Sequence, residues 1–375
     1  MNRWFDYYVG VPLMKVLRPL SKWAREESGP PKRILVIKLA AVGDTVLLIP
    51  LLRSLRAAYP DASLHWLVSS INQSIAKTVP YVDRLHAWSP KTIMGLFLLI
   101  RNLRKERFDT VIDLEQWSRG SAILSFLTGA QRRVGFDTPG QSRASLYTSA
   151  VEKKFNQHEI LDFYDVAGLV GPLQRDVRLE LWETEQGRLD VQTRLSLEKK
   201  GNTSSKKILI HPGCGEDGLP REWPLPSYGV LGHWLVKNFK ADLFLTSGPE
   251  EKKKTAQLKQ LLNGQARDWG GKLTWDGMIS LVNQVDLVIS GNTGIMHIAA
   301  ALQKPQVALH GPTNQKLWGP LNSRAIVLQS SCPQCPCLRL GFEYHTRDQS
   351  CMKRIDVEDV KLAVQRLFDS PPRIL

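Results

Sequence analysis

Residues 289–301 combine side-chain types that can hold a phosphate. They read Ile-Ser-Gly-Asn-Thr-Gly-Ile-Met-His-Ile-Ala-Ala-Ala and follow an apolar run that predicts a strand ending at Ile289. The turn opens into a helix expected over 295–302. Backbone N–H groups, the Thr293 hydroxyl and the positive end of a helix dipole would therefore meet beyond the strand. His297 would lie one turn inside that helix. The alternative is an ordinary strand–helix connection with a buried histidine.

A carboxylate suited to proton transfer stands at Asp44, beyond the first predicted strand. Its segment, 38–45, reads Lys-Leu-Ala-Ala-Val-Gly-Asp-Thr. Gly43 permits a tight turn, and Asp44 would fall in the first turn of a helix, where Asp also serves as an ordinary N-cap. In the functional interpretation, the carboxylate takes a proton from an attacking hydroxyl. The helix terminus is expected to lower the pKa of Asp44 and keep it ionised.

Two further segments follow predicted strands and carry groups suited to a nucleotide. Residues 211–215 read His-Pro-Gly-Cys-Gly, and Arg-Glu-Trp-Pro follows at 221–224. The glycine turn can approach a phosphate closely, and Arg221 can neutralise a leaving diphosphate. Residues 247–251 read Ser-Gly-Pro-Glu-Glu, which supplies a carboxylate for a ribose or a base, or simply begins the next helix.

The elements that would position these residues alternate between strands and helices in both halves of the chain. This alternation is typical of an α/β protein with a parallel sheet covered by helices on both faces. We expect an amphipathic basic segment over 1–30, a first domain over 31–197, a polar linker over 198–206, a second domain over 207–355 and a C-terminal helix within 356–375. Two such domains facing a cleft would bind a ligand at the carboxyl ends of both sheets.

The composition describes a soluble globular protein of two domains. The chain has 375 residues, of which 43% are hydrophobic and 23% charged, and a net charge of +14. This charge favours polyanionic partners such as nucleotides and phosphorylated lipids. We expect no nucleic-acid partner, because no recognised binding module is present. No G-x-G-x-x-G follows the first predicted strand and no G-x4-G-K-[ST] occurs, so the sequence favours neither a nicotinamide or flavin site nor a P-loop kinase.

The N-terminal residues mix aromatic and aliphatic side chains with Arg and Lys. The scattered charges interrupt any signal-peptide core, and no apolar run is long enough for a membrane span. From Pro12 onward, the pattern fits an amphipathic helix at a membrane surface. A helix packed on the protein's own surface is the alternative.

Four cysteines form the pattern C-x2-C-x-C-x13-C, at Cys332, Cys335, Cys337 and Cys351. Four cysteines so close in sequence make a structural zinc ion one alternative. The spacing is not a standard zinc pattern, and it favours a disulfide pair or free thiols in a reducing cytosol over bound metal. We expect no catalytic metal ligand in the chain.

Taken in order, these segments resemble glycosyltransferase family 9, the ADP-heptose:lipopolysaccharide heptosyltransferases. Each block is weak alone, but their ordered combination is specific. The resembling blocks are residues 34–50, 211–224, 247–251, 290–302 and 310–320, the last of which reads His-Gly-Pro-Thr-Asn and ends in Leu-Trp-Gly-Pro.

The resemblance implies a GT-B fold of two Rossmann-like doubly wound domains, with the C-terminal helix crossing back onto the first. It implies an inverting, metal-independent transfer that needs no cofactor beyond a nucleotide-sugar, with an ADP-sugar favoured. Asp44 matches the presumed general base, with Lys38 and Gly43 on the acceptor side. The residues expected to bind the donor are His211, Gly213, Arg221, Glu251, Asn292, Thr293, Gly294 and His297.

Asn292 departs from the pattern, because several heptosyltransferases have Asp at this position. A neutral amide can hydrogen-bond a sugar hydroxyl but supplies no charge. The expected acceptor is a phosphorylated glycolipid, which places the protein in the cytoplasm, peripherally bound to the inner face of the inner membrane. Two alternatives are an epimerase-like GT-B enzyme acting on a nucleotide-sugar and a non-catalytic binding protein of the same fold.

Overall fold

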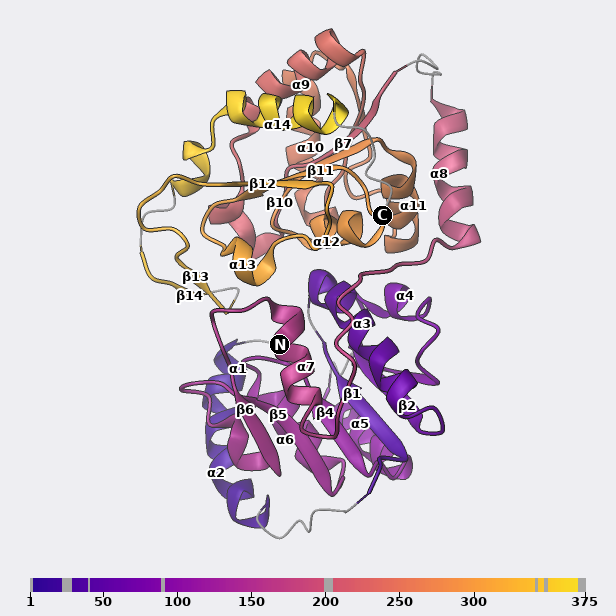
Figure 1. Ribbon diagram of the computed structural model, residues 1–375, viewed down its shortest axis with the longest axis vertical. Helices are drawn as coiled ribbons and strands as arrows, with labels where there is room; N and C mark the ends of the chain where they lie inside the picture. Colours follow the sequence, from indigo (N-terminus) through magenta and orange to yellow (C-terminus); the bar gives the residue numbers. More distant parts are fainter. Residues whose placement is uncertain are drawn as a thin grey trace. The chain divides into compact units, whose positions relative to one another are not determined.

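The computed structural model describes residues 3–21, 29–39, 41–88, 92–198, 205–340, 343–346 and 350–369. Contacts divide the chain into two units, residues 1–178 and 179–375. Each unit contains one six-stranded sheet covered by helices (Figure 1). Within the described ranges, we find no helix with the length and apolarity that a membrane span requires.

The first unit is built on a parallel sheet with strand order β3-β2-β1-β4-β5-β6. Its strands are buried almost throughout near the centre, as expected of a parallel sheet with both faces covered. The strands are β1 (Arg33–Ile37), β2 (Ser63–Ser69), β3 (Arg84–Trp88), β4 (Thr110–Asp113), β5 (Arg132–Asp137) and β6 (Ser149–Glu152). The helices are α1 (Arg3–Tyr8), α2 (Gly10–Ser21), α3 (Val42–Ala58), α4 (Gln73–Ala76), α5 (Ile93–Lys105), α6 (Arg119–Leu127) and α7 (Glu159–Ala167).

The second unit repeats this design with strand order β12-β11-β10-β7-β8-β9, again parallel. The strands are β7 (Lys207–His211), β8 (Asp242–Leu245), β9 (Ala266–Asp268), β10 (Leu287–Gly291), β11 (Gln306–His310) and β12 (Ala325–Gln329). The helices are α8 (Glu185–Leu197), α9 (Leu225–Phe239), α10 (Lys252–Leu261), α11 (Trp275–Gln284), α12 (Gly294–Ala301), α13 (Gln315–Trp318) and α14 (Val357–Asp369). A short hairpin, β13 (Leu338–Arg339) and β14 (Glu343–Tyr344), precedes the last helix.

Both sheets have the strand order of a Rossmann fold, which confirms the predicted doubly wound architecture. In such a sheet the chain runs outward in both directions from a central pair of strands. Ligands bind beyond the carboxyl ends of that pair. The central pairs are β1 with β4 in the first unit and β7 with β10 in the second.

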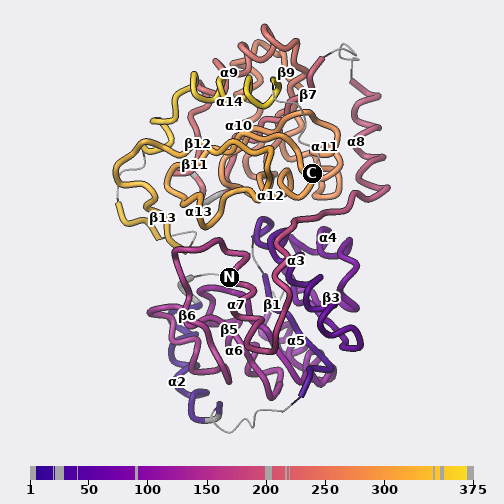
Figure 2. The backbone as a smooth tube through the Cα atoms, viewed as in Figure 1, coloured from indigo at the N-terminus to yellow at the C-terminus, as the bar shows by residue number. Residues whose placement is uncertain are grey.

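The boundary between the units lies earlier than the predicted linker. α8 packs against α11 (Figure 2), and Gly187 lies so close to it that a Cβ would be 2.4 Å from the Asp276 carbonyl oxygen. The segment 179–197 therefore belongs to the second unit, not to the first domain as expected. Residues 199–204 of the predicted linker lie outside the described residues.

The C-terminal helix differs from expectation in its packing partner. We expected it to cross back onto the first domain, but α14 packs on α9, β11 and β12 of the second unit. The Phe368 ring lies 5.0 Å from that of Phe239, centroid to centroid. The apolar side chains of α14 thus complete the core of the second unit, whose sheet precedes this helix in the chain.

The N-terminal segment forms α1 and α2, which pack along one side on α6 of the same unit. Asp6 accepts a hydrogen bond from the Arg119 backbone N–H at 2.8 Å and pairs with its guanidinium at 3.1 Å. Met14 is buried, whereas Tyr8 and Val16 are 59% and 68% exposed. One side of the segment therefore packs on the protein's own surface. Contact of the other side with a membrane remains a prediction.

Candidate active site

The carboxyl end of β1 carries a buried ion pair between Lys38 and Asp44. The Lys38 Nζ lies 2.7 Å from the Asp44 Oδ2, and the two side chains are 2% and 14% exposed. Asp44 is the third residue of α3, while Ala41 occupies the N-cap position. The N-cap interpretation of Asp44 is therefore wrong, because its carboxylate turns to the lysine instead.

Burial decides the acid–base properties of this pair. Burial raises the pKa of Asp44 above its ordinary value, and the Lys38 charge only partly offsets this. The expectation that the helix terminus would lower this pKa is thus wrong. Burial disfavours the charged form of Lys38, but the carboxylates of Asp44 and Glu115 outweigh it and raise the lysine pKa. A carboxylate with a raised pKa, held beside a permanent cation, is a better proton acceptor than an exposed aspartate.

Glu115 completes the site from the neighbouring strand, and sequence reasoning missed it. It follows β4, and its Oε1 lies 3.6 Å from the Lys38 Nζ and accepts the Leu39 backbone N–H at 2.6 Å. Its own backbone N–H donates to the Asp113 Oδ1 at 3.0 Å. The signal in the sequence is the run Asp-Leu-Glu at 113–115, at the end of a predicted strand.

A buried network holds Asp113 in turn. Arg143 contacts the Asp113 Oδ2 at 3.0 Å, and the Tyr147 hydroxyl donates to the same oxygen at 2.7 Å. Arg143 and Asp113 are wholly buried. These residues fix the Asp113 carboxylate, which in turn accepts the Glu115 backbone N–H.

Glu159, at the start of α7, is a second acid that the sequence did not indicate. Its carboxylate pairs with Lys153 at 2.7 Å and accepts a hydrogen bond from the Gln116 side-chain amide. Burial raises its pKa to about 7, and the nearby charge of Asp44 adds to the shift. Glu159 and Asp44 are therefore electrostatically linked at one edge of the sheet.

In the second unit, the turn between β10 and α12 presents polar atoms without protein partners. Thr293 is the N-cap of α12, but its side chain makes no capping hydrogen bond. The Asn292 Nδ2 and the Thr293 Oγ1 are buried and have no hydrogen-bond partner among the described residues. Such atoms are costly unless a ligand satisfies them. Gly294 begins the helix, and His297, one turn on, is 3% exposed.

The turn after β7 lies beside β10 and is held by the residues predicted to bind the donor. Glu251 accepts the Cys214 backbone N–H at 3.2 Å, and Arg221 donates to the Cys214 carbonyl at 3.0 Å. The turn needs glycine, because a Cβ on Gly213 would lie 2.3 Å from the Glu251 Oε2. Lys254, which sequence reasoning missed, pairs with Glu251 at 2.8 Å. Arg221 and Glu251 thus converge on one turn, with the Arg221 Nε buried and unpartnered among the described residues.

His211, the last residue of β7, can contribute hydrogen bonds but not charge. It is 7% exposed, and its Nδ1 lies 3.0 Å from the Thr246 Oγ1. Burial lowers its pKa to about 4, so its imidazole is neutral at pH 7.

Two successive doubly wound domains, with charged or unpartnered polar groups beyond the central strands, have the architecture of the GT-B class. The family model described as glycosyltransferase family 9 (heptosyltransferase) matches residues 96–347. The chain belongs to this family and is a glycosyltransferase, as the ordered sequence blocks predicted.

The relatives agree with this assignment over most of the chain. Lipopolysaccharide heptosyltransferase 2 of Escherichia coli is 26% identical over 315 residues, covering 79% of this chain and 88% of the relative. The family 9 structure from Veillonella parvula gives a TM-score of 0.75 at 21% identity and covers 92% of this chain and 99% of that one. The E. coli heptosyltransferase WaaC, solved with ADP, gives 0.65 at 19% identity and covers 89% and 99%.

Proposed function

We propose that this glycosyltransferase moves heptose from ADP-heptose onto a lipopolysaccharide core or a related surface glycolipid. One observation carries the donor half of the proposal. The N-terminus of α12 presents the buried, unpartnered Asn292 Nδ2 and Thr293 Oγ1 where a Rossmann-like sheet binds its ligand. The relatives support the sugar and the nucleotide, because their names specify heptose transfer and one was solved with ADP.

The chemistry is a single displacement with inversion at the anomeric carbon. An acceptor hydroxyl attacks that carbon, its proton passes to the Asp44 carboxylate, and the bond to the diphosphate breaks with its electron pair leaving on ADP. Arg221 and the N-terminus of α12 stabilise the charge that grows on the diphosphate. These donor-side groups are a guanidinium and backbone N–H groups, which can neutralise a diphosphate without a metal ion.

The pH dependence of transfer depends on Lys38. Since its charge lowers the pKa of Asp44 against the effect of burial, a Lys38→Met substitution raises that pKa. Less Asp44 is then ionised at a given pH, so the acid limb of the profile of kcat/KM against pH is expected to move to higher pH. A limb that stays in place or moves to lower pH contradicts the role of the pair.

The free energy of unfolding of the Lys38→Met variant has to be measured alongside its pH profile. Removing one partner of a buried ion pair costs about 3–5 kcal/mol, because the other charge is left uncompensated. Denaturation curves at each pH will separate loss of fold from the shift of the acid limb.

Calorimetric titration with ADP, UDP, GDP and CMP, without added metal, tests the donor half directly. We expect selective binding of ADP, and a Thr293→Val substitution should weaken it about 10- to 150-fold by removing one hydrogen bond to a charged group. Thr193→Val, on the exposed face of α8, serves as the control. Preference for UDP or GDP contradicts ADP-heptose as donor, and binding of no nucleotide favours the non-catalytic alternative. The family match does not favour the epimerase-like alternative.

The proposed acceptor is a membrane lipid. We propose that the first unit contacts the membrane from the cytoplasm, at the inner face of the inner membrane. On α2, Val16 is exposed beside Lys15 and Arg18. On α5, the side chains of Ile93 and Phe97 are 89% and 60% exposed. Both helices contact α6. Apolar side chains beside cations suit an anionic lipid interface. In flotation with anionic vesicles, the double variant V16D/F97D should bind less than V230D, a change on α9 of the second unit. Equal binding by the two variants contradicts the proposal.

A further inference from the structure

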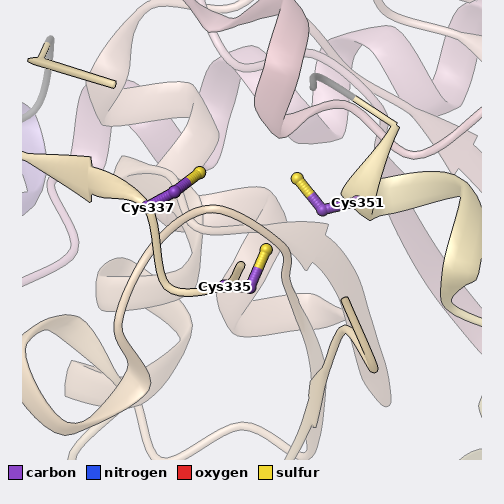
Figure 3. Close-up of side chains that lie close together, drawn as sticks. All are labelled: Cys335, Cys337 and Cys351. Carbon is purple, nitrogen blue, oxygen red and sulfur yellow. The ribbon is translucent and has the colours of Figure 1, made fainter. Parts of the chain in front are cut away.

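Three of the four cysteines of the pattern C-x2-C-x-C-x13-C come together in the fold. The Sγ atoms of Cys335, Cys337 and Cys351 all lie within 4.8 Å of one another. In Figure 3 the three sulfur atoms point toward a common space, two from the loop that carries Cys335 and Cys337 and one from the segment of Cys351. Cys337 and Cys351 are 2% and 1% exposed, whereas Cys335 is half-buried.

Cys332 lies beside this group of three, although its Sγ is not within 4.8 Å of all of them. It is 5% exposed. The thiols of Cys351 and Cys332 both lie close enough to the Cys335 thiol to interact with it. All four thiols are free.

Backbone hydrogen bonds fix the loops that carry these thiols. The Cys335 N–H donates to the Cys332 carbonyl at 3.0 Å, and the Cys337 N–H donates to the Pro312 carbonyl at 2.9 Å. The Ser330 hydroxyl donates to the Cys351 carbonyl at 2.6 Å and accepts the Cys332 N–H at 3.2 Å. One serine thus joins the first and last cysteines, and the cluster is held before any ligand enters.

The arrangement fits a metal ion better than a disulfide. Around zinc, Zn–S bonds of about 2.3 Å place tetrahedral sulfur atoms about 3.8 Å apart. Three sulfur atoms mutually within 4.8 Å, with a fourth adjacent, are near that geometry. A disulfide would join two sulfur atoms at about 2.0 Å and leave two buried thiols without a role.

We propose that Cys332, Cys335, Cys337 and Cys351 bind one thiophilic metal ion, zinc or iron, through four sulfur atoms. The thiols release their protons to solvent as the ion binds. The cysteine spacing alone favoured a disulfide pair or free thiols, whereas the fold favours a bound metal ion. The ion lies apart from the transfer chemistry and acts on structure.

The site would stabilise the segment that carries Arg221. Cys351 begins a 3-10 turn, 351–354, which contacts the 3-10 turn 216–221 that ends at Arg221. The Trp223 Nε1 donates to the Ile355 carbonyl at 2.9 Å, next to that turn. A bound ion would therefore fix the C-terminal hairpin against the donor side of the second unit.

Metal analysis of the full chain, purified without a metal-affinity step, tests the proposal. We expect one equivalent of zinc or iron in the wild type and in Cys214→Ser, which changes the cysteine outside the cluster. Cys337→Ser and Cys351→Ser should lose the metal. Because these variants can lose their fold, the wild type should also be stripped with a chelator and reloaded with Co²⁺. Sulfur-to-cobalt charge-transfer bands are expected.

Wild type that contains no metal, and gives no such bands with Co²⁺, overturns the proposal. So does a disulfide between any two of the four cysteines in protein purified under argon. Neither readout requires a sugar donor or an acceptor, so the result is independent of the proposed transfer reaction.

Discussion

The Asp44→Asn variant is expected to lower kcat for heptose transfer by about 10²- to 10⁴-fold, the range typical of a lost general base. Asparagine keeps the size of the side chain but cannot take the acceptor proton. Since Asp44 belongs to the first unit and the proposed donor site to the second, the dissociation constant for ADP should not change. Steady-state kinetics together with calorimetry measure both quantities.

Asp61→Asn is the matched control, because Asp61 is an exposed acid in the same unit. Its kcat should equal that of the wild type. Glu115 still faces Lys38 in the Asp44 variant, so the fold should survive, and a melting curve checks this. An unchanged kcat in folded Asp44→Asn would remove Asp44 as the base and direct attention to Glu115 or Glu159, the other acids near this strand end.

Arg221→Ala should lower kcat/KM by about 10²- to 10³-fold, because a cation aimed at developing diphosphate charge is worth several kcal/mol in a shielded site. Arg221→Lys should recover part of the loss, since an ammonium keeps the charge but not the planar pair of donors. Arg188→Ala, exposed on α8, is the control for loss of a positive charge.

Arg221 also donates to the Cys214 carbonyl and so holds the turn after β7. If this were its whole role, the activity lost in Arg221→Ala would be accompanied by a lowered melting temperature. Loss of activity in Arg221→Ala at a melting temperature near that of the wild type separates charge stabilisation from support of the turn.

The sequence predicted the parts of the site that depend on local order. Thr293 caps the helix that follows β10, and Asp44 lies in the first turn of the helix that follows β1, so the structure places both beyond central strands. Gly43 lies inside that first turn and not in the preceding loop, where it was expected. Glu115 and Lys254 were missed because their positions depend on which strands become neighbours and which helix returns to the turn. Spacing along the chain carries little of that information.

Two expectations were wrong because each was drawn from local sequence and omitted the tertiary structure. The helix-terminus argument for the pKa of Asp44 used a local dipole and omitted burial, which proved the larger effect. The apolar stripe of α14 predicted that this helix is buried on one side, but a stripe does not specify its partner, and the partner is the second sheet. The four cysteines show the converse, because their irregular spacing hides a cluster that only the fold assembles.

The most direct test is an NMR analysis of the reaction of the wild type with ADP-heptose and a lipopolysaccharide-core acceptor, without added metal. The account predicts release of ADP in equal amount to a heptosylated glycolipid whose anomeric configuration is opposite to that of the donor. A product with retained configuration, or ADP release without any glycosylated acceptor, would contradict it.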